Sequence, residues 1–528
     1  MTRSVRLALG ALLVALLAGA ASLWVSGAWR AGLSGADEPA HFLNTLVIAR
    51  YAADALGSDP MAYATEFYLH YPKISIGHWP PGYYAALAPL FMVLPPTPAT
   101  AMAVNLVLAA LPAVIAGLLA ARVLGTRLGL LVAALCALTP VALEGFAFFM
   151  LDQPLAAAAL AATGLWIAFV GRPRAWVVLL FGLVAAWAVL IKGNGWLLLF
   201  VPPIHLALTG RWRVLASPWP WLAALLAALV VGPWYWLTAG IAADGFNYQP
   251  GPVYAAQALG YNFGALSDNV TPLGLALAAW GLWRGWQARA DGNAWSILSG
   301  CAALVLATLL LQSLVPVDLD ARYMAPALPP LIVLAVYGAR DVMARFGRPN
   351  LAVPVALVLA VPGVVHLATR EPKVDLRLAD VAAQTRAGDA WLIDGTSGAE
   401  GALAAEMAIR DREAKSYMIR ASSLLARSDF MGSRYALAYT DPAAIRARLR
   451  ELGVSGIAVV RAQNQPAFPH SALLRRALLE QGWRRTAVLA HGGRAGTTEI
   501  FRPAAPVVPD TRAIRALGVP AKAKGLSG

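Results

Sequence analysis

Two adjacent carboxylates, Asp37 and Glu38, stand directly after the first long apolar segment of this 528-residue chain. A carboxylate can serve as a general base for a hydroxyl or amine nucleophile. Only two lysines, Lys73 and Lys192, occur among the first 370 residues, and a cation can stabilise a departing phosphate. These residue types indicate a site in which a base activates a nucleophile while cations hold a phosphate leaving group.

Further charges occur at the ends of apolar segments. Asp152 opens one such segment and Lys192 ends another. A charge near membrane depth costs up to about 3 kcal/mol on insertion scales, so such residues usually line a polar cavity or pair with one another. Either residue alone could equally mark the membrane boundary. Together with Asp37, Glu38 and the run 318–323, they predict a charged cavity on one side of the membrane.

The composition indicates whether the protein is soluble or embedded in a membrane. With 59% hydrophobic residues, 13% charged residues and a mean hydropathy of +0.61, the chain has too few charges to cover a soluble globule. A polytopic α-helical membrane protein is therefore expected. The net charge of +14 comes from arginines in short gaps between apolar segments, which argues against nucleic-acid binding. Cys136 and Cys301 lie within apolar segments and are expected to be packing residues.

The apolar segments give the positions of the helices. The first extends to about residue 28, and we interpret it as a retained helix rather than a signal peptide. Each span needs about 20 residues to cross a bilayer. About eleven spans are expected, with twelve or thirteen as the alternative, the later ones near 99–121, 128–148, 153–170, 175–191, 194–209, 216–238, 270–283, 294–314, 325–343 and 351–368.

Threading these spans alternately separates the charges. Arg3 and Arg6 hold the N-terminus in the cytoplasm by the positive-inside rule. The same threading places the later arginine pairs on the cytoplasmic side, at 122/127, 172/174, 211/213, 284/289 and 345/348. The outer side receives the acids Asp37, Glu38, Asp54, Asp59, Glu66, Asp152, Asp244, Asp268, Asp318 and Asp320. The expected location is a bacterial inner membrane, with the site on the periplasmic face.

The chain divides into three parts. Residues 1–370 form the membrane domain, with a long first external loop over about 29–98; its apolar segment 82–94, flanked by prolines, is expected at the outer interface. Residues 371–502 form a periplasmic α/β domain, because short β-like runs alternate with helical ones. The runs are 391–394, 435–439, 456–460 and 486–489, with helices over 399–412, 442–452 and 471–481. Residues 503–528 are expected to be a disordered tail.

The chain shows no Walker loop, no dinucleotide fingerprint and no zinc-ligand spacing. No cofactor or metal is therefore predicted, although a divalent cation is not excluded. Nucleotide sugars and ATP are absent outside an inner membrane, so an activated donor at this site would be carried on a lipid phosphate. That chemistry is glycosyl transfer from a polyprenyl phosphate.

Five motifs, in this order, resemble the GT-C superfamily of membrane glycosyltransferases, within it most of all glycosyltransferase family 39 and the aminoarabinose transferases that act on lipid A. They are the pair 37–38 and the stretches 79–84, 151–155, 192–193 and 322–329. The resemblance covers about residues 1–370. It implies a polyprenyl-phosphate sugar donor, inversion at the anomeric carbon, and a catalytic acid in the first external loop.

The resemblance also implies roles for single residues. Asp37 becomes the general base, with Glu38 and Asp152 positioning the acceptor or the base. Lys192 and Arg322, with Tyr323 beside them, would hold the donor phosphate. Relatives often have a lysine before the Pro-Pro pair, where this chain has Trp79, and either Lys73 or His78 could supply that cation instead.

The remaining candidates would line the substrate cavity. His41 stands one turn after Asp37, and Glu144 stands close to the helical face of Asp152. Trp79, Tyr83 and Tyr84 could stack on a sugar ring, although Tyr and Trp are common at any membrane interface. A surface role is the alternative for His41, and one or two stacking aromatics are the most we expect.

Two other functions fit part of the pattern. A transporter or flippase of a lipid-linked sugar would have charges near the bilayer midplane and pseudo-symmetric halves, whereas here the charges gather at the outer edge. A non-catalytic assembly factor would leave the acid pair without a role. The sequence does not distinguish a protein, lipid A or other glycan acceptor, nor does it identify the sugar; the C-terminal domain is expected to bind the acceptor or act as a lid.

Overall fold

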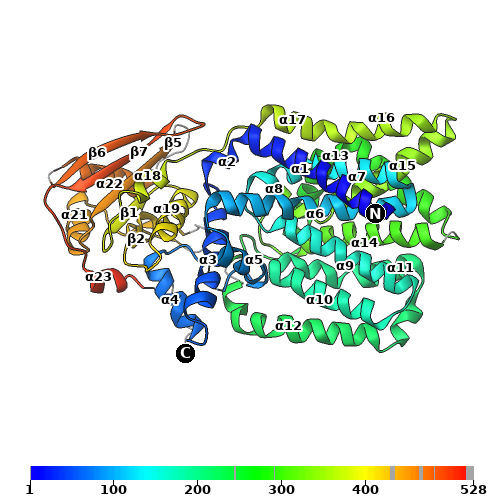
Figure 1. The fold of residues 1–528 in the computed structure, drawn as a ribbon, viewed down its shortest axis with the longest axis horizontal. Helices are drawn as coiled ribbons and strands as arrows, with labels where there is room; N and C mark the ends of the chain where they lie inside the picture. The colour runs from blue at the N-terminus through cyan, green and yellow to red at the C-terminus, as the bar shows by residue number, and fades with distance from the viewer. Residues whose placement is uncertain are drawn as a thin grey trace.

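The computed structural model describes residues 2–75, 77–242, 245–290, 292–428, 434–462, 468–480 and 482–518. A long helical bundle and a smaller sheet-containing domain lie end to end, with the helices of the first external loop between them (Figure 1). This arrangement matches the expected polytopic helical membrane protein with a C-terminal α/β domain.

The bundle is formed by the long apolar helices of the membrane domain. α1 (Arg3–Ser26) packs through its small residues, because Ala11 and Ala15 are fully buried while Leu13 and Leu17 are exposed. Small residues at the contact and large apolar ones outward are typical of helices in lipid. The others are α6 (Pro98–Leu124), α7 (Thr126–Ala137), α8 (Pro140–Ala147), α9 (Asp152–Gly171), α10 (Ala175–Ile191), α11 (Val201–Thr209), α12 (Trp219–Ala242), α13 (Pro252–Gln287), α14 (Gly292–Leu314), α15 (Leu328–Arg345), α16 (Ala352–Leu357) and α17 (Val361–Thr369).

The expected number of about eleven spans is not confirmed by helix length and composition. In the described part of the chain, six helices are long and apolar enough to cross a membrane, or seven if α7 and α8, bent by 64°, form one span. α10 is a shorter apolar helix. The expected span at 270–283 is the second half of the 36-residue α13, which has a non-helical Thr271 (φ 66°, ψ 158°) before Pro272. Breaks of this kind divide the apolar sequence differently from a simple hydropathy count.

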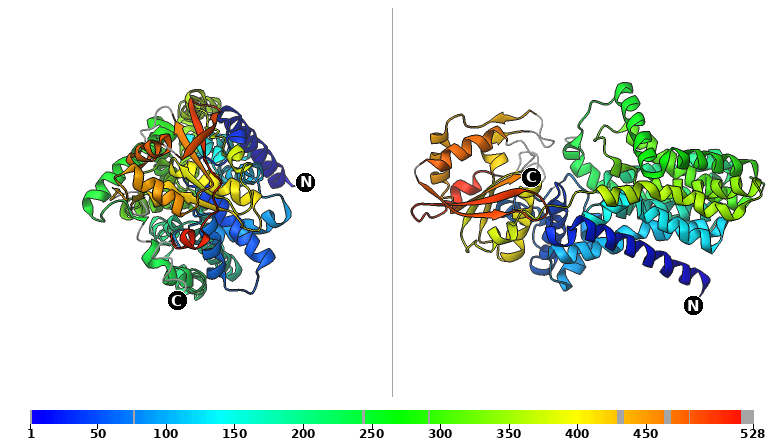
Figure 2. Two further views of the ribbon diagram at one scale, coloured as in Figure 1. Left: turned by 90° about the vertical axis from the view of Figure 1, so that its left-hand side faces the viewer. Right: turned by 90° about the horizontal axis from the view of Figure 1, so that it is seen from above.

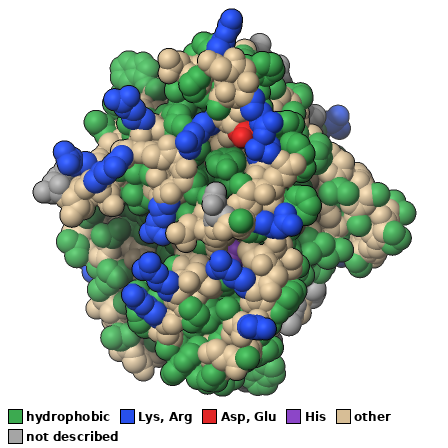
Figure 3. All heavy atoms as spheres, turned by 90° about the vertical axis from the view of Figure 1, so that its right-hand side faces the viewer, with side chains coloured by type: hydrophobic (Ala, Val, Ile, Leu, Met, Phe, Trp, Pro, Cys, Tyr) green, Lys and Arg blue, Asp and Glu red, His purple; other side chains and the backbone are tan. Residues whose placement is uncertain are grey.

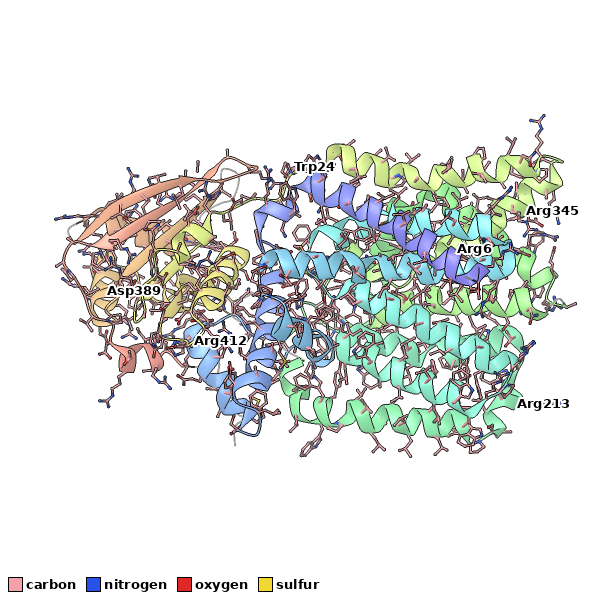
Figure 4. All side chains as sticks on the ribbon, in the orientation of Figure 1. Arg6, Trp24, Arg213, Arg345, Asp389 and Arg412 are labelled. Carbon is pink, nitrogen blue, oxygen red and sulfur yellow. The ribbon has the colours of Figure 1, made fainter. Side chains whose placement is uncertain are left out.

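Arginines gather at the end of the bundle away from the C-terminal domain. Figure 3 shows many basic and hardly any acidic side chains on that face, and Figure 4 places Arg213 and Arg345 there. Arg3 donates to Thr126 at 2.7 Å, which ties the N-terminus to the α6–α7 connection. Figure 2 shows the N-terminus in the same half of the bundle. The expected separation of arginines from the acid-rich end is therefore present in three dimensions.

The expected first external loop, about residues 29–98, is mostly helical. It contains α2 (Ala28–Ala31), α3 (Glu38–Asp54), α4 (Pro60–His70) and α5 (Gly82–Val93). α3 crosses the end of the bundle and α5 packs on it, with the rings of Phe42 and Phe91 5.3 Å apart. This layer of helices lies between the bundle and the C-terminal domain, so its residues can contact either part.

The C-terminal domain has a five-stranded sheet in the order β2-β1-β5-β7-β6. β1 pairs in parallel with β2 and β5, while β7 pairs antiparallel with β5 and β6. The bounds are β1 (Ala390–Asp394), β2 (Tyr417–Arg420), β5 (Gly456–Ala462), β6 (Trp483–Ala490) and β7 (Gly496–Pro503), with helices α18 (Leu378–Ala382), α19 (Ser397–Arg410), α20 (Ala421–Leu424), α21 (Pro442–Glu451) and α22 (Pro469–Leu479).

The expected β-like run 435–439 contains a short strand, β4 (Ala436–Leu437), which pairs with β3 (Ala426–Arg427) outside the main sheet. One expectation for this domain was wrong. The expected disordered tail is folded as far as 518: α23 (Thr511–Arg515) buries Ile514, and Arg515 donates to Glu66 at 2.6 and 2.7 Å. Residues 519–528, and Asp244 of the expected outer acids, lie outside the described residues.

Candidate active site

Asp37 lies at the start of α3 and faces a cation from the turn that precedes α15. It is the N-cap residue of α3, yet its side chain makes no capping hydrogen bond. Both terminal nitrogens of Arg322, in the 3-10 turn η4 (Ala321–Met324), donate to Asp37 Oδ2 at 3.2 Å. Arg322 Nε also lies 2.9 Å from Asp320 Oδ2. One arginine therefore joins two carboxylates, Asp37 and Asp320, that are 283 positions apart in the sequence.

Asp152 and Lys192 meet because α9 starts where α10 ends. Lys192 Nζ donates to Asp152 Oδ1 at 2.6 Å, and the two side chains are only 11% and 7% exposed. The Lys192 ammonium lies 4.4 Å from the centre of the Tyr323 ring, and the Arg322 guanidinium carbon lies 5.5 Å from it. We call Asp37, Asp152, Lys192, Asp320, Arg322 and Tyr323 the Tyr323 cluster.

One acceptor in this cluster is vacant. Asp152 Oδ2 is buried and has no hydrogen-bond partner among the described residues. A buried carboxylate oxygen without a donor is costly, so this atom is suited to accept a hydrogen bond from a bound molecule. The Tyr323 cluster thus combines two cations with a carboxylate oxygen open to a ligand.

His41 lies one helical turn after Asp37 on α3. Its Nδ1 is 2.8 Å from the Tyr84 hydroxyl, and its ring centre is 4.6 Å from that of Trp79. Burial lowers the pKa of His41 to about 3, against an opposing effect of Asp37. The imidazole is therefore neutral near pH 7 and is enclosed by aromatic rings.

The charge state of Asp37 follows from its neighbours. Burial raises the pKa of the Asp37 carboxyl, whereas His41, Arg322, Lys192 and Lys73 lower it, and the net pKa lies below the ordinary value of 3.8. Since His41 is neutral near pH 7, we attribute the lowering there to the three cations. Asp37 is therefore a carboxylate at neutral pH, which is the form that a general base requires.

Lys73 approaches this region from the first external loop. Its Nζ donates to the Ser397 hydroxyl at 2.7 Å, at the start of α19 in the C-terminal domain. Burial lowers the pKa of Lys73 to about 8, and Arg420 contributes in the same direction. His78 lies half-buried in the same loop. The structure thus places Lys73 between the two domains.

Glu38 does not join its neighbour Asp37 in the Tyr323 cluster. Its side chain is fully buried and accepts hydrogen bonds from the backbone nitrogens of Gly35 and Phe149, at 2.7 and 2.8 Å. The Lys373 ammonium donates to Glu38 Oε1 at 2.7 Å and lies 3.3 Å from the Ala147 carbonyl. We call these five residues the Glu38 cluster. Because donors of the protein hold both of its oxygens, these contacts favour the expected role of Glu38 in positioning the base over direct contact with an acceptor.

Three expected lining residues are engaged in contacts within the protein. Glu144 pairs with Arg370 at 2.7 Å and His366 at 3.2 Å, away from Asp152. Tyr83 and Tyr84 are each only 2% exposed and belong to the core. Their rings are therefore not available for stacking on a sugar, whereas Trp79 is half-buried. Proximity in sequence or on a helical face did not predict these contacts, because the side chains turn toward α17 and α3 instead.

Lys373 is the residue that the sequence patterns missed. It lies in the connector between the membrane domain and α18, three residues beyond the 370-residue stretch in which lysine is scarce. Its side chain is 3% exposed. Among the described residues, no group of three or more His, Cys, Asp or Glu side chains could hold a metal ion.

Comparisons with known proteins support this reading of the fold. The family model described as dolichyl-phosphate-mannose-protein mannosyltransferase matches residues 79–236. The structure of ArnT from Cupriavidus metallidurans in the apo state has a TM-score of 0.55 at 13% identity, covering 96% of this chain and 98% of that one. A comparison with curated protein sequences gives no match.

Two further structures carry bound or tethered molecules. ArnT from the same organism bound to undecaprenyl phosphate also has a TM-score of 0.55 at 13% identity, covering 97% of this chain and 98% of that one. The oligosaccharyltransferase of Archaeoglobus fulgidus, tethered to an acceptor peptide, has a TM-score of 0.51 at 13% identity, covering 85% of this chain and 68% of that one.

The apolar helices are those of a multi-pass membrane protein, and the fold is similar to that of ArnT. The chain is similar over nearly its whole length to ArnT, and over a smaller share to the archaeal oligosaccharyltransferase. The expected resemblance is thereby confirmed at the level of the fold.

Proposed function

We propose that this protein is a glycosyltransferase that takes its sugar from a polyprenyl-phosphate-linked donor. The observation that supports this most is the Tyr323 cluster, where Lys192 and Arg322 lie on one tyrosine ring beside the carboxylates Asp37 and Asp152. Two cations suit a phosphate leaving group. The similar fold of ArnT, solved with undecaprenyl phosphate, supports a donor of this type.

In the proposed reaction, Asp37 accepts the proton of the acceptor hydroxyl or other nucleophile. The acceptor atom forms a bond to the anomeric carbon from the face opposite the phosphate. The bond from that carbon to the phosphate oxygen breaks, and polyprenyl phosphate leaves with the electron pair, held by Lys192 and Arg322. Attack opposite to the leaving group inverts the anomeric configuration.

The ion pair of Asp37 with Arg322 suggests how donor binding prepares the base. Each contact is 3.2 Å long and both side chains are 30% exposed. A donor phosphate competes with Asp37 for the guanidinium, since phosphate and carboxylate both suit its planar fork. Donor binding would then release Asp37 Oδ2 for the acceptor, while Asp152 Oδ2 accepts from a substrate hydroxyl.

The proposed location is a bacterial inner membrane. The arginine-rich end of the bundle would face the cytoplasm, by the positive-inside rule, together with the N-terminus. The Tyr323 cluster and the C-terminal domain would then be periplasmic. A fusion of alkaline phosphatase after residue 400 should be active, whereas activity of a cytoplasmic reporter there would overturn this orientation.

Turnover of Asp37→Asn tests the catalytic proposal. Full-length protein in membranes is supplied with a set of polyprenyl-phosphate sugars, and transfer is measured by loss of donor. Removing a general base lowers rates by about 10²–10⁴-fold. Asp380→Asn, which alters an exposed ion pair with Arg377 in the C-terminal domain, is the matched control. Normal turnover by folded Asp37→Asn would contradict the proposal.

The sugar and the acceptor require a separate experiment. Envelope glycolipids and glycoproteins are compared by mass spectrometry in cells with and without the protein. A pentose or hexose mass missing from one acceptor class identifies both. Translocation of labelled donor without any missing product would instead support a flippase.

A further inference from the structure

The connector between the two domains places a buried cation beside the acid pair. Lys373 follows α17, which ends at Thr369, and its backbone nitrogen donates to the Ser26 carbonyl at 2.8 Å. The side chain then enters the membrane domain, where it contacts Glu38 and the Ala147 carbonyl and lies 4.6 Å from the centre of the Phe148 ring. This lysine therefore belongs to the connector by sequence and to the membrane domain by contact.

Glu38 joins the two chain segments that lead to the proposed catalytic acids. Its Oε2 accepts from Gly35, in the turn that carries Asp37, and its Oε1 accepts from Phe149, three residues before Asp152. Gly35 has no room for a side chain, since a Cβ there would lie 2.8 Å from Glu38 Oε2. One carboxylate thus sets the distance between the two turns.

That carboxylate is buried and depends on Lys373 for its counter-charge. The two side chains are 0% and 3% exposed, with a contact of 2.7 Å. Burial of one charge without its partner is strongly unfavourable, whereas replacing both partners by apolar or neutral groups of similar size is often tolerated. Loss of Lys373 alone is therefore expected to displace Glu38, and with it both turns.

We propose that Lys373 is a positioning residue: through Glu38 it holds the turns of Asp37 and Asp152 at their working separation, which couples the C-terminal connector to the Tyr323 cluster. The effect on turnover depends on the proposed glycosyltransferase function. The effect on the two turns does not, because it follows from the contacts of Glu38 alone.

Hydrogen–deuterium exchange of the full-length protein in lipid nanodiscs measures the turns directly. Lys373→Met should raise the exchange rate at Gly35 and Phe149 by about 10-fold or more, because their amide hydrogens lose a fixed acceptor. Lys373→Arg should retain protection. Lys415→Met, which alters an exposed lysine paired with Glu413, should leave both peptides unchanged. Equal protection in Lys373→Met and wild type would overturn the proposal.

A double variant separates positioning from folding. Glu38→Gln/Lys373→Met removes both charges and should restore the thermal stability lost in Lys373→Met. It should not restore turnover, since one glutamine oxygen cannot accept from both turns. Exchange that rises throughout the C-terminal domain in Lys373→Met, with no excess in the two turns, would show a structural role only and would overturn the proposal.

Kinetics with a polyprenyl-phosphate sugar complete the test. Lys373→Met should lower kcat by about 10²-fold, the effect of a small misplacement of catalytic groups, with KM for the donor changed less than about 3-fold. Lys373→Arg should recover most of kcat. If wild-type protein transfers no sugar, the proposed function fails while the exchange result still decides the positioning role. A normal kcat in an active background would overturn that role.

Discussion

The Tyr323 cluster and the Glu38 cluster are built from similar charged groups, but they differ in how completely those groups are satisfied. Asp37 and Arg322 are each 30% exposed and meet at 3.2 Å, and Asp152 Oδ2 has no partner in the described part of the chain. Glu38 and Lys373 are almost fully buried at 2.7 Å, and both Glu38 oxygens accept hydrogen bonds. Loose, partly open ion pairs can exchange partners with a ligand, whereas a saturated buried pair fixes geometry.

The largest difference should appear when the two neighbouring acids are neutralised separately. Asp37→Asn should lower turnover by about 10²–10⁴-fold and change the free energy of unfolding by less than about 1 kcal/mol, as for other partly exposed pairs. Glu38→Gln should cost about 3–5 kcal/mol of stability, because Lys373 is left as a buried unpaired charge. Chemical denaturation and initial rates measure the two effects. Similar stabilities for the two variants would contradict the contrast.

Crowding at the domain contact should give the next largest effect. A Cβ at Gly398 would lie 2.4 Å from the Ser34 carbonyl oxygen, so Gly398→Ala must push α19 away from the turn that precedes Asp37. Overpacking of this kind costs about 1–3 kcal/mol, and turnover should fall with it. Gly171→Ala is the control, because a Cβ at Gly171 would meet open space. Gly388 would not serve, because its φ of 87° would strain any side chain there. An unaffected Gly398→Ala variant would show that the contact is dispensable.

The pH dependence of the Tyr323 cluster follows from the lowered pKa of Asp37. The base works only when ionised, so kcat/KM should stay high until the pH falls below the ordinary carboxyl value of 3.8. Arg322→Gln removes a cation that lowers this pKa, and the acid limb should therefore move to higher pH. The pH profile of kcat/KM is measured together with the donor KM of the variant. An acid limb that does not move in this profile would mean that a group other than Asp37 titrates.

Lys73 should give opposite pH effects on activity and stability. Burial lowers its pKa from 10.5 to about 8, so its ammonium is lost above about pH 8, and donor KM should rise there if the cation binds phosphate. Between pH 8 and 10.5 the unfolded chain binds more protons at this residue, so the free energy of unfolding contributed by Lys73 should rise with pH. Lys73→Met should abolish both trends. If they persist in this variant, Lys73 is not the group whose titration causes them.

The smallest effect is expected at an exposed pair across the same domain contact. Arg412 donates to Asp54 at 3.0 Å, with the side chains 72% and 45% exposed. Exposed pairs contribute about 0–1 kcal/mol, so Arg412→Ala should change stability by less than about 1 kcal/mol and leave turnover unchanged. A larger loss would mean that surface charges, rather than the Glu38 cluster, hold the domains together.

Much of the Tyr323 cluster could be predicted before the fold was known. Asp152 opens an apolar segment and Lys192 closes one, and alternate threading of the spans brings both to the side of Asp37 and Arg322. Topology therefore brings these helix ends to one end of the bundle, where the structure places them in contact. The roles of Glu144, Tyr83 and Tyr84 did not follow, because each depends on which neighbouring helix its side chain meets.

The sequence by itself determined that the chain is embedded in a membrane, that its arginines segregate and that its acids gather at one end of the bundle, since all of these depend on apolar length and the order of charges along the chain. Only the tertiary structure decided which of two adjacent acids faces the site. Neighbouring residues at a helix start project about 100° apart, and the connector that carries Lys373 lies 335 positions from Glu38. A contact over that distance is made by domain packing, which no local pattern records.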